Sequence, residues 1–132
     1  MTQVEHDEQG MKEAIEAVFV RGAEAWNRRD LDGYLATYAD GDHVRWVSGG
    51  KMITGKTAIK NALDPRFASG EAMGKLAIKQ LQIEIKTPSN ALVFGTWQLQ
   101  FDREEMSGVF TVHLQLVSDM WLIVSDHASV LE

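Results

Sequence analysis

The chain has 132 residues, a net charge of −6 and no cysteine. The missing cysteines exclude disulfides, thiolate catalysis and cysteine-ligated metals, and the scattered basic residues form no stripe that would bind a nucleic acid. No apolar run is long enough to cross a membrane, and the polar, acidic N-terminus is unlike a signal peptide. We therefore expect one cytoplasmic domain over residues 1–132, with no nucleic-acid or membrane partner.

Three helices are predicted in the first half of the chain. Residues 7–29 carry apolar side chains at spacings of three and four, as one face of a helix requires. Asp30 is a plausible N-cap for a short second helix, which ends at the turn of residues 40–42. A third helix follows Gly55, and Pro65 should end it or bend it.

Strands dominate the remaining sequence. A short hairpin is expected from residues 44–48 and 51–53, joined by Gly49 and Gly50. Four longer strands follow, with a change of parity near Lys79–Gln80 that predicts a β-bulge; the last three cover residues 91–101, 106–117 and 121–130. Short turns between strands imply antiparallel neighbours, so the order of elements predicts an α+β domain with its helices on one sheet face.

Two groups of residues carry a resemblance to a known family. The segment AWNRRDLDG (residues 25–33), followed by YLATYADGDHV, resembles the nuclear-transport-factor-2-like (NTF2-like) superfamily, in particular its ketosteroid-isomerase and SnoaL-like branches. The segments ALVFGTW (91–97) and WLIVSDHAS (121–129) are similar to the branch known as DUF4440. The resemblance spans roughly residues 10–130. It implies a cone in which a curved, mostly antiparallel sheet wraps around three N-terminal helices and encloses a pocket.

The resemblance also allows a test for ketosteroid isomerase chemistry. Those enzymes use an aspartate base together with a tyrosine and a protonated aspartic acid. Counted from the shared DLDG corner, the base position is Trp46, the tyrosine position is Gly22, and the late acid lies near Val112. Isomerase chemistry by that mechanism is therefore not expected, and no cofactor is implied.

Alternation in the last strand singles out one ionisable residue. If Trp121 and Ile123 face inward, Ser125, His127 and Ser129 face inward as well, and Asp126 faces outward. His127 is then the only catalytic candidate, as an acid, a base or a hydrogen-bond donor. The favoured alternative is that His127 hydrogen-bonds a neighbouring backbone group or tyrosine and only shapes the pocket. The predicted ligand-binding residues are Trp46, Trp97, Tyr38, Ser125 and His127.

The outer sheet face and the histidines complete the sequence-based predictions. Leu92 and Phe94 lie among neutral polar residues on the face opposite Trp97, a pattern typical of a covered surface. In this superfamily that face commonly pairs two subunits, so a homodimer is expected through Leu92, Phe94, Thr96, Thr111, His113 and Gln115. The four histidines are dispersed, and no metal site is predicted.

Three functions fit these observations. The preferred one is binding of a small apolar or aromatic molecule in the cone. The first alternative is a cofactor-independent isomerase, dehydratase or cyclase that uses His127. The second is an oligomeric association module whose pocket is vestigial.

Overall fold

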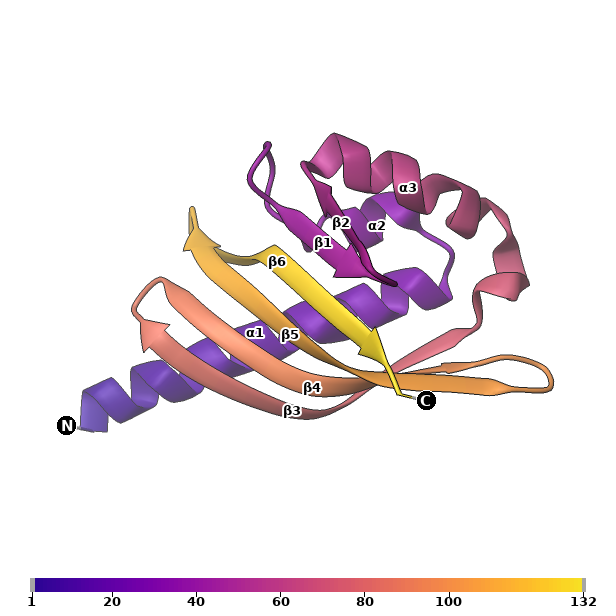
Figure 1. Ribbon diagram of the computed structural model, residues 1–132. Coiled ribbons are helices and arrows are strands. Elements are labelled where there is room, and N and C mark those ends of the chain that lie inside the picture. The colour runs from indigo at the N-terminus through magenta and orange to yellow at the C-terminus, as the bar shows by residue number, and fades with distance from the viewer. Residues whose placement is uncertain (1, 132) are drawn as a thin grey trace.

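A computed structural model describes residues 2–131 (Figure 1). The helices are α1 (Thr2–Asn27), α2 (Leu31–Leu35) and α3 (Lys56–Ala68), and a short 3₁₀ turn, η1, covers Gly70–Met73. The strands are β1 (Arg45–Ser48), β2 (Lys51–Thr54), β3 (Lys75–Thr87), β4 (Asn90–Gln100), β5 (Glu105–Val117) and β6 (Met120–Val130). This is the α+β architecture that the sequence predicts.

The six strands form one curved, open sheet in the order β2-β1-β6-β5-β4-β3. All neighbours are antiparallel except β1 and β6, which run parallel, so the sheet is mixed. In Figure 1, α1 runs along the long strands β3–β6, whereas α2, α3 and the β1–β2 hairpin gather at one end of the sheet.

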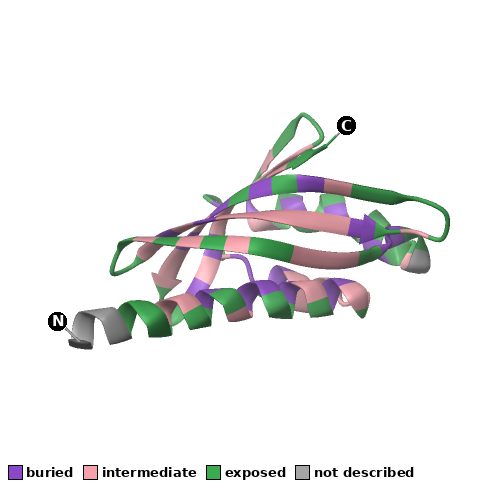
Figure 2. Ribbon diagram, turned by 90° about the horizontal axis from the view of Figure 1, so that it is seen from below, coloured by how far each residue is buried: buried purple, intermediate pink, exposed green. Residues whose placement is uncertain are grey.

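Helix α1 packs one side against the sheet. Its buried residues include Ile15, Val18, Phe19 and Trp26, which follow the predicted spacing. Figure 2 shows the consequence: residues 7–10 of α1 are exposed, and buried positions recur along its C-terminal part. At its end, the Asn27 side chain donates to the Leu76 carbonyl (3.0 Å) and accepts from the Leu76 amide (2.8 Å), which ties α1 to the start of β3.

The three predicted helices are present, but their ends differ from those expected. Helix α1 covers Thr2–Asn27 instead of residues 7–29, and α2 ends at Leu35, before the turn of residues 40–42. Asp30 is the N-cap of α2, where its carboxylate accepts from the Gly33 amide (3.0 Å). Pro65 does not end α3, which continues to Ala68. The last turn is retained because it buries Phe67 against Trp26, with ring centroids 5.2 Å apart, and packing of this kind outweighs the lost backbone hydrogen bond.

Among the described residues, two bulges lie inside the long strands, and a third register shift occurs at the end of β3, between Ile85 and Thr87. The first is the predicted one, since the pairing of β3 with β4 shifts between Lys79 and Gln82 and Gln80 has a positive φ of 57°. The second was not predicted. His113 of β5 pairs with Ser125 while the adjacent Leu114 pairs with Ile123, so Val124 is an extra residue in β6.

No helix within residues 2–131 is long and apolar enough to cross a membrane.

Candidate functional site

A cavity of about 130 Å³ lies between the helices and the inner face of the sheet. Its wall is mostly apolar, and among the described residues it contains one carboxylate, Asp126, and one basic side chain, Arg66. Helices supply Val18, Phe19, Gly22, Ala23, Trp26, Tyr34 and Arg66, and the segment after α2 supplies Thr37 and Tyr38; the sheet supplies Trp46, Ser48, Leu76, Ile78, Trp97, Leu99, Phe110, Val112, Ile123, Asp126 and Ala128.

The bulge at Val124 decides which residues of β6 face this cavity. Before the bulge, Trp121 and Ile123 face inward and are buried, as predicted. After it the parity is reversed, so Asp126 lies opposite the buried Val112 and lines the cavity. An inserted residue changes the side on which every later side chain emerges.

The predicted orientation of the last strand is therefore wrong beyond Val124. His127 is exposed, pairs with Thr111 and Val47, and does not line the cavity; Ser125 lies outside it too. His127 consequently loses its place as the catalytic candidate, and Asp126, which was expected to face outward, replaces it. Four consecutive apolar residues, Trp121–Val124, conceal the change of parity, and their lack of alternation is the one sequence signal that could have disclosed it.

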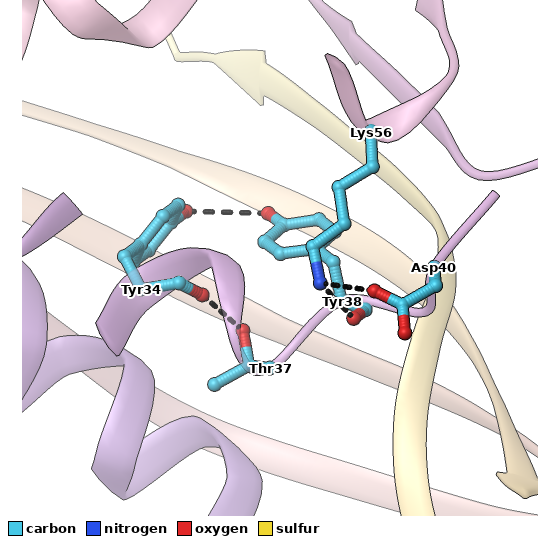
Figure 3. Close-up of polar contacts among 5 residues, drawn as sticks. All are labelled: Tyr34, Thr37, Tyr38, Asp40 and Lys56. Carbon is cyan, nitrogen blue, oxygen red and sulfur yellow. Dashed lines mark hydrogen bonds and ion pairs between the residues drawn. The ribbon is translucent and has the colours of Figure 1, made fainter. Parts of the chain in front are cut away.

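Tyr38 holds the Asp126 carboxylate by a short hydrogen bond. The Tyr38 hydroxyl donates to Asp126 Oδ2 at 2.5 Å. The same hydroxyl lies 3.3 Å from the Tyr34 hydroxyl, and Figure 3 shows this pair of tyrosines. The backbone fixes this geometry: the Ala39 amide donates to the Ile123 carbonyl (2.8 Å), and the Ile123 amide donates to the Thr37 carbonyl (2.9 Å). The segment after α2 is thus joined to β6 immediately before the bulge.

Burial changes the acid–base properties of all three groups. Desolvation raises the pKa of Asp126 to about 6, against the lowering effects of the Tyr38 hydrogen bond and the His127 charge. The pKa values of Tyr38 and Tyr34 lie well above their ordinary range, chiefly through burial and then through the Asp126 charge. Both tyrosines therefore stay protonated as donors, whereas Asp126 changes charge near neutral pH.

Lys56 fixes the same segment from outside the cavity (Figure 3). Its ammonium donates to the Tyr38 carbonyl (3.1 Å) and to Asp40 Oδ1 (2.9 Å), and this contact with Lys56 lowers the pKa of Asp40. The Thr37 hydroxyl donates to the Tyr34 carbonyl (2.7 Å). These contacts help to hold both tyrosines in place, and Lys56 and Asp40 lie outside the cavity wall.

The three tryptophans in the wall contribute apolar surface. Trp97 donates its indole N–H to the Ser129 carbonyl (3.2 Å), and Trp26 donates to the Gly74 carbonyl (3.2 Å). The indole N–H groups of Trp97 and Trp26 are thus already bonded to the backbone, and the faces of these rings remain for contact. Three of the predicted pocket residues lie in the cavity wall: Trp46, Trp97 and Tyr38. Their role in ligand binding stays a prediction.

The positions that correspond to the isomerase catalytic groups also lie in this wall. Gly22, Trp46 and Val112 all line the cavity, and Trp46 and Val112 are the strand partners of Asp126 on either side. The cavity thus has a carboxylate, but it comes from β6 instead of the strand expected from the resemblance. A carboxylate with a pKa of about 6 can accept and return a proton near neutral pH.

The six residues of the predicted interface lie on the other sheet face. Leu92 pairs with His113 and Phe94 with Thr111 across β4 and β5, and His113 and Gln115 both contact the Asn90 side-chain oxygen. Leu92 and Phe94 are half-buried within one chain.

Among the side chains that the structure describes, no three histidine, aspartate or glutamate groups gather as they would around a metal ion.

Comparisons with known proteins place the chain in a family. A family model for a SnoaL-like domain matches residues 15–132. A similar solved structure is an NTF2-like protein of unknown function from Shewanella oneidensis MR-1, with 29% identity, coverage of 89% of this chain and 98% of that chain, and a TM-score of 0.84. None of the curated proteins matches this chain significantly.

Two more distant structures share the fold alone. One, from Novosphingobium aromaticivorans DSM 12444, is provisionally named a scytalone dehydratase; it is 13% identical, with coverage of 100% of this chain and 89% of that chain and a TM-score of 0.84. The other, from Thiobacillus denitrificans ATCC 25259, is provisionally named a calcium/calmodulin-dependent protein kinase type II association domain; it is 23% identical, with coverage of 89% and 94% and a TM-score of 0.73. The DUF4440 branch stays a prediction. Because the family model covers most of the sequence and the fold agrees with it, the chain belongs to the SnoaL-like family of NTF2-like proteins.

Proposed function

We propose that the protein binds a small apolar or aromatic molecule in the cavity, with an oxygen atom of that molecule directed at Asp126 and Tyr34. The observation that carries the proposal is a mostly apolar wall that contains, among the described residues, one carboxylate; ligand pockets usually combine an apolar lining with a few polar groups. The volume of about 130 Å³ suits one aromatic ring, since an engineered apolar cavity of about 150 Å³ binds benzene. A cytoplasmic location stays a prediction.

The hydrogen bonds in the wall determine how such a ligand would be oriented. Asp126 accepts from Tyr38 through Oδ2, and among the described residues its Oδ1 has no side-chain partner. An ionised Asp126 would accept from a ligand hydroxyl. A protonated Asp126 would instead be a donor, and it could donate to a ligand carbonyl. It could also donate to the Tyr38 hydroxyl; Tyr38 would then donate to Tyr34, and the Tyr34 hydroxyl proton would be free to donate to the ligand.

Cofactor-independent proton transfer is a second candidate function, and Asp126 favours it specifically. A half-buried carboxylate whose pKa desolvation raises to about 6 is a general base near its most effective range. It would remove a proton from carbon next to a ligand carbonyl, while the tyrosine hydroxyls stabilise the negative charge that develops on oxygen. The structure provisionally named a scytalone dehydratase is only 13% identical to this chain, so its name alone does not assign that reaction to this protein.

Filling the cavity should abolish binding. A Cβ atom at Gly22 has its nearest contact at 3.8 Å, with a methyl group of Thr37, so a larger side chain there can extend into the cavity. We expect acetophenone and phenylacetamide to raise the melting temperature of the wild type, and Gly22→Leu to bind them at least about tenfold more weakly, the loss of roughly 1.4 kcal/mol.

His127→Asn is the matched control, because His127 lies outside the cavity. This variant should bind both probes like the wild type, as measured by titration calorimetry. The binding proposal fails if neither probe binds the wild type, or if Gly22→Leu binds them unchanged. A loss of binding in His127→Asn would return that residue to the site.

We also propose that two chains pair through the outer faces of β4 and β5. The support is the apolar pair Leu92 and Phe94 among neutral polar side chains, together with the fold shared with structures provisionally named as association domains. Sedimentation velocity should give the mass of two chains for the wild type and of one chain for Phe94→Lys. Ala58→Lys, which adds the same charge at an exposed position of α3, should remain dimeric. A monomeric wild type, or a dimeric Phe94→Lys, would exclude this interface.

A further inference from the structure

Arg66 is the only basic side chain in the wall of the cavity among the described residues. It lies in the last turn of α3 and is exposed to solvent, so it marks a place where the cavity meets bulk water. Its guanidinium carbon is 5.1 Å from the centroid of the Trp26 ring. The neighbouring Phe67 packs against Trp26 and Tyr34, which fixes this turn of the helix against the cavity.

The Arg66 charge has no carboxylate partner among the described side chains. The four ion pairs found there involve Arg28, Lys56, Lys60 and Lys86, and no described hydrogen bond uses the Arg66 guanidinium. Stacking on Trp26 shields one face of the guanidinium from water and leaves its N–H groups at the edge able to donate. The charge also reaches the cavity interior, because Arg66 is one of the groups that act on Tyr34: burial raises the pKa of that hydroxyl and Arg66 partly lowers it.

We propose that the ligand of the cavity is a small organic acid whose carboxylate pairs with Arg66, while its apolar ring or chain occupies the cavity. The proposal rests on the binding function proposed above and names the class of ligand. A planar guanidinium forms two parallel hydrogen bonds with a carboxylate, and an aromatic ring beneath it keeps it oriented.

The other charges of the site determine the orientation of such a ligand. Asp126, when ionised, repels a second carboxylate, so the acid group belongs at Arg66 and the opposite end of the molecule belongs at Asp126 and the tyrosines. The protein has a net charge of −6 and does not attract anions in general. Arg66, which pairs with no carboxylate among the described side chains, is therefore a local positive charge at the cavity. A positive charge is favoured in the last turn of a helix, but this does not explain why the side chain lies in the cavity wall.

Matched acids and amides test the proposal. The probes are phenylacetate, 3-phenylpropanoate and 4-phenylbutanoate, each compared with its primary amide, which has nearly the same size and no charge. We expect the best acid to bind the wild type about tenfold more tightly than its amide. Arg66→Met should lose this preference while its affinity for the amides stays within about twofold, and Arg66→Lys should keep part of it. Arg103→Met removes the same charge from an exposed turn outside the cavity and should behave like the wild type.

The possible results distinguish the role of Arg66 from the binding function proposed for the cavity. Amides that bind as tightly as the acids, or an acid preference that survives in Arg66→Met, would overturn the role of Arg66 and leave the binding function standing. If neither acids nor amides bind the wild type, both proposals fail. The melting temperature of each variant, measured without probe, shows whether a loss of affinity reflects a loss of folded protein.

Discussion

Asp126→Asn should make the protein more stable at pH 8 and should have much less effect at pH 4. The pKa of Asp126 is raised from 3.8 to about 6 in the folded state, so the folded protein holds this proton more tightly than the unfolded chain does. The stabilising effect of protonation is complete below the unfolded value, and it is lost as the pH rises through the folded value. A shift of about two units corresponds to roughly 3 kcal/mol of unfolding free energy, most of it lost between pH 4 and pH 7.

The asparagine variant removes the cost of burying an ionised carboxylate but keeps the hydrogen bond from Tyr38. Its side-chain oxygen can still accept from the Tyr38 hydroxyl, and its size is nearly unchanged. Urea unfolding at pH 4 and pH 8 measures the difference from the wild type, which cancels the titration of all other groups. Asp64→Asn, at an exposed position of α3, controls for the loss of one negative charge. A difference between Asp126→Asn and wild type that does not grow with pH would show that Asp126 is not a desolvated acid.

The same variant separates ligand binding from proton transfer. Asparagine cannot accept a proton from carbon, yet it leaves the volume of the cavity almost unchanged. If Asp126 is a general base, the wild type exchanges the methyl protons of acetophenone for deuterium, as followed by NMR, and Asp126→Asn loses this activity by about a hundredfold or more. A wild type that binds acetophenone without exchange would exclude the second candidate function for this ketone and retain the first.

Gly108→Ala should be the most damaging of these substitutions. A Cβ atom at this position would lie 1.8 Å from the Ser129 carbonyl oxygen and 2.6 Å from the indole nitrogen of Trp97. The first neighbour is backbone of the adjacent strand, so the clash cannot be relieved by moving a side chain. We expect a loss of at least about 3 kcal/mol, equivalent to a fall of roughly 10 °C in melting temperature.

The clash also affects the cavity, because the Trp97 indole lies across Gly108 and donates to Ser129. Binding of neutral ring compounds should therefore weaken in whatever fraction of Gly108→Ala still folds. Gly10→Ala is the matched control: it makes the same chemical change on α1, where the new methyl group meets nothing within 4 Å, and alanine there should stabilise the helix slightly. A Gly108→Ala protein as stable as Gly10→Ala would contradict the close approach of β5, β6 and Trp97.

The sequence by itself determines the scaffold. The spacing of Ile15, Val18 and Trp26, the Asp30 cap and the parity change near Gln80 are local signals, and each corresponds to an observed element. The DLDG corner adds the family resemblance, which the SnoaL-like match bears out. These features are predictable because helix periodicity, caps and turns depend on neighbours within a few residues.

Only the tertiary structure decided which ionisable group faces the cavity. The extra residue Val124 can be located only when β6 is paired with β5, and it exchanges the positions of Asp126 and His127. Tyr38 reaches Asp126 across 88 positions of sequence, and Arg66 meets Trp26 through the packing of α3 on α1. Strand register and helix packing are set by contacts between distant segments, so the pattern within a single strand does not determine them.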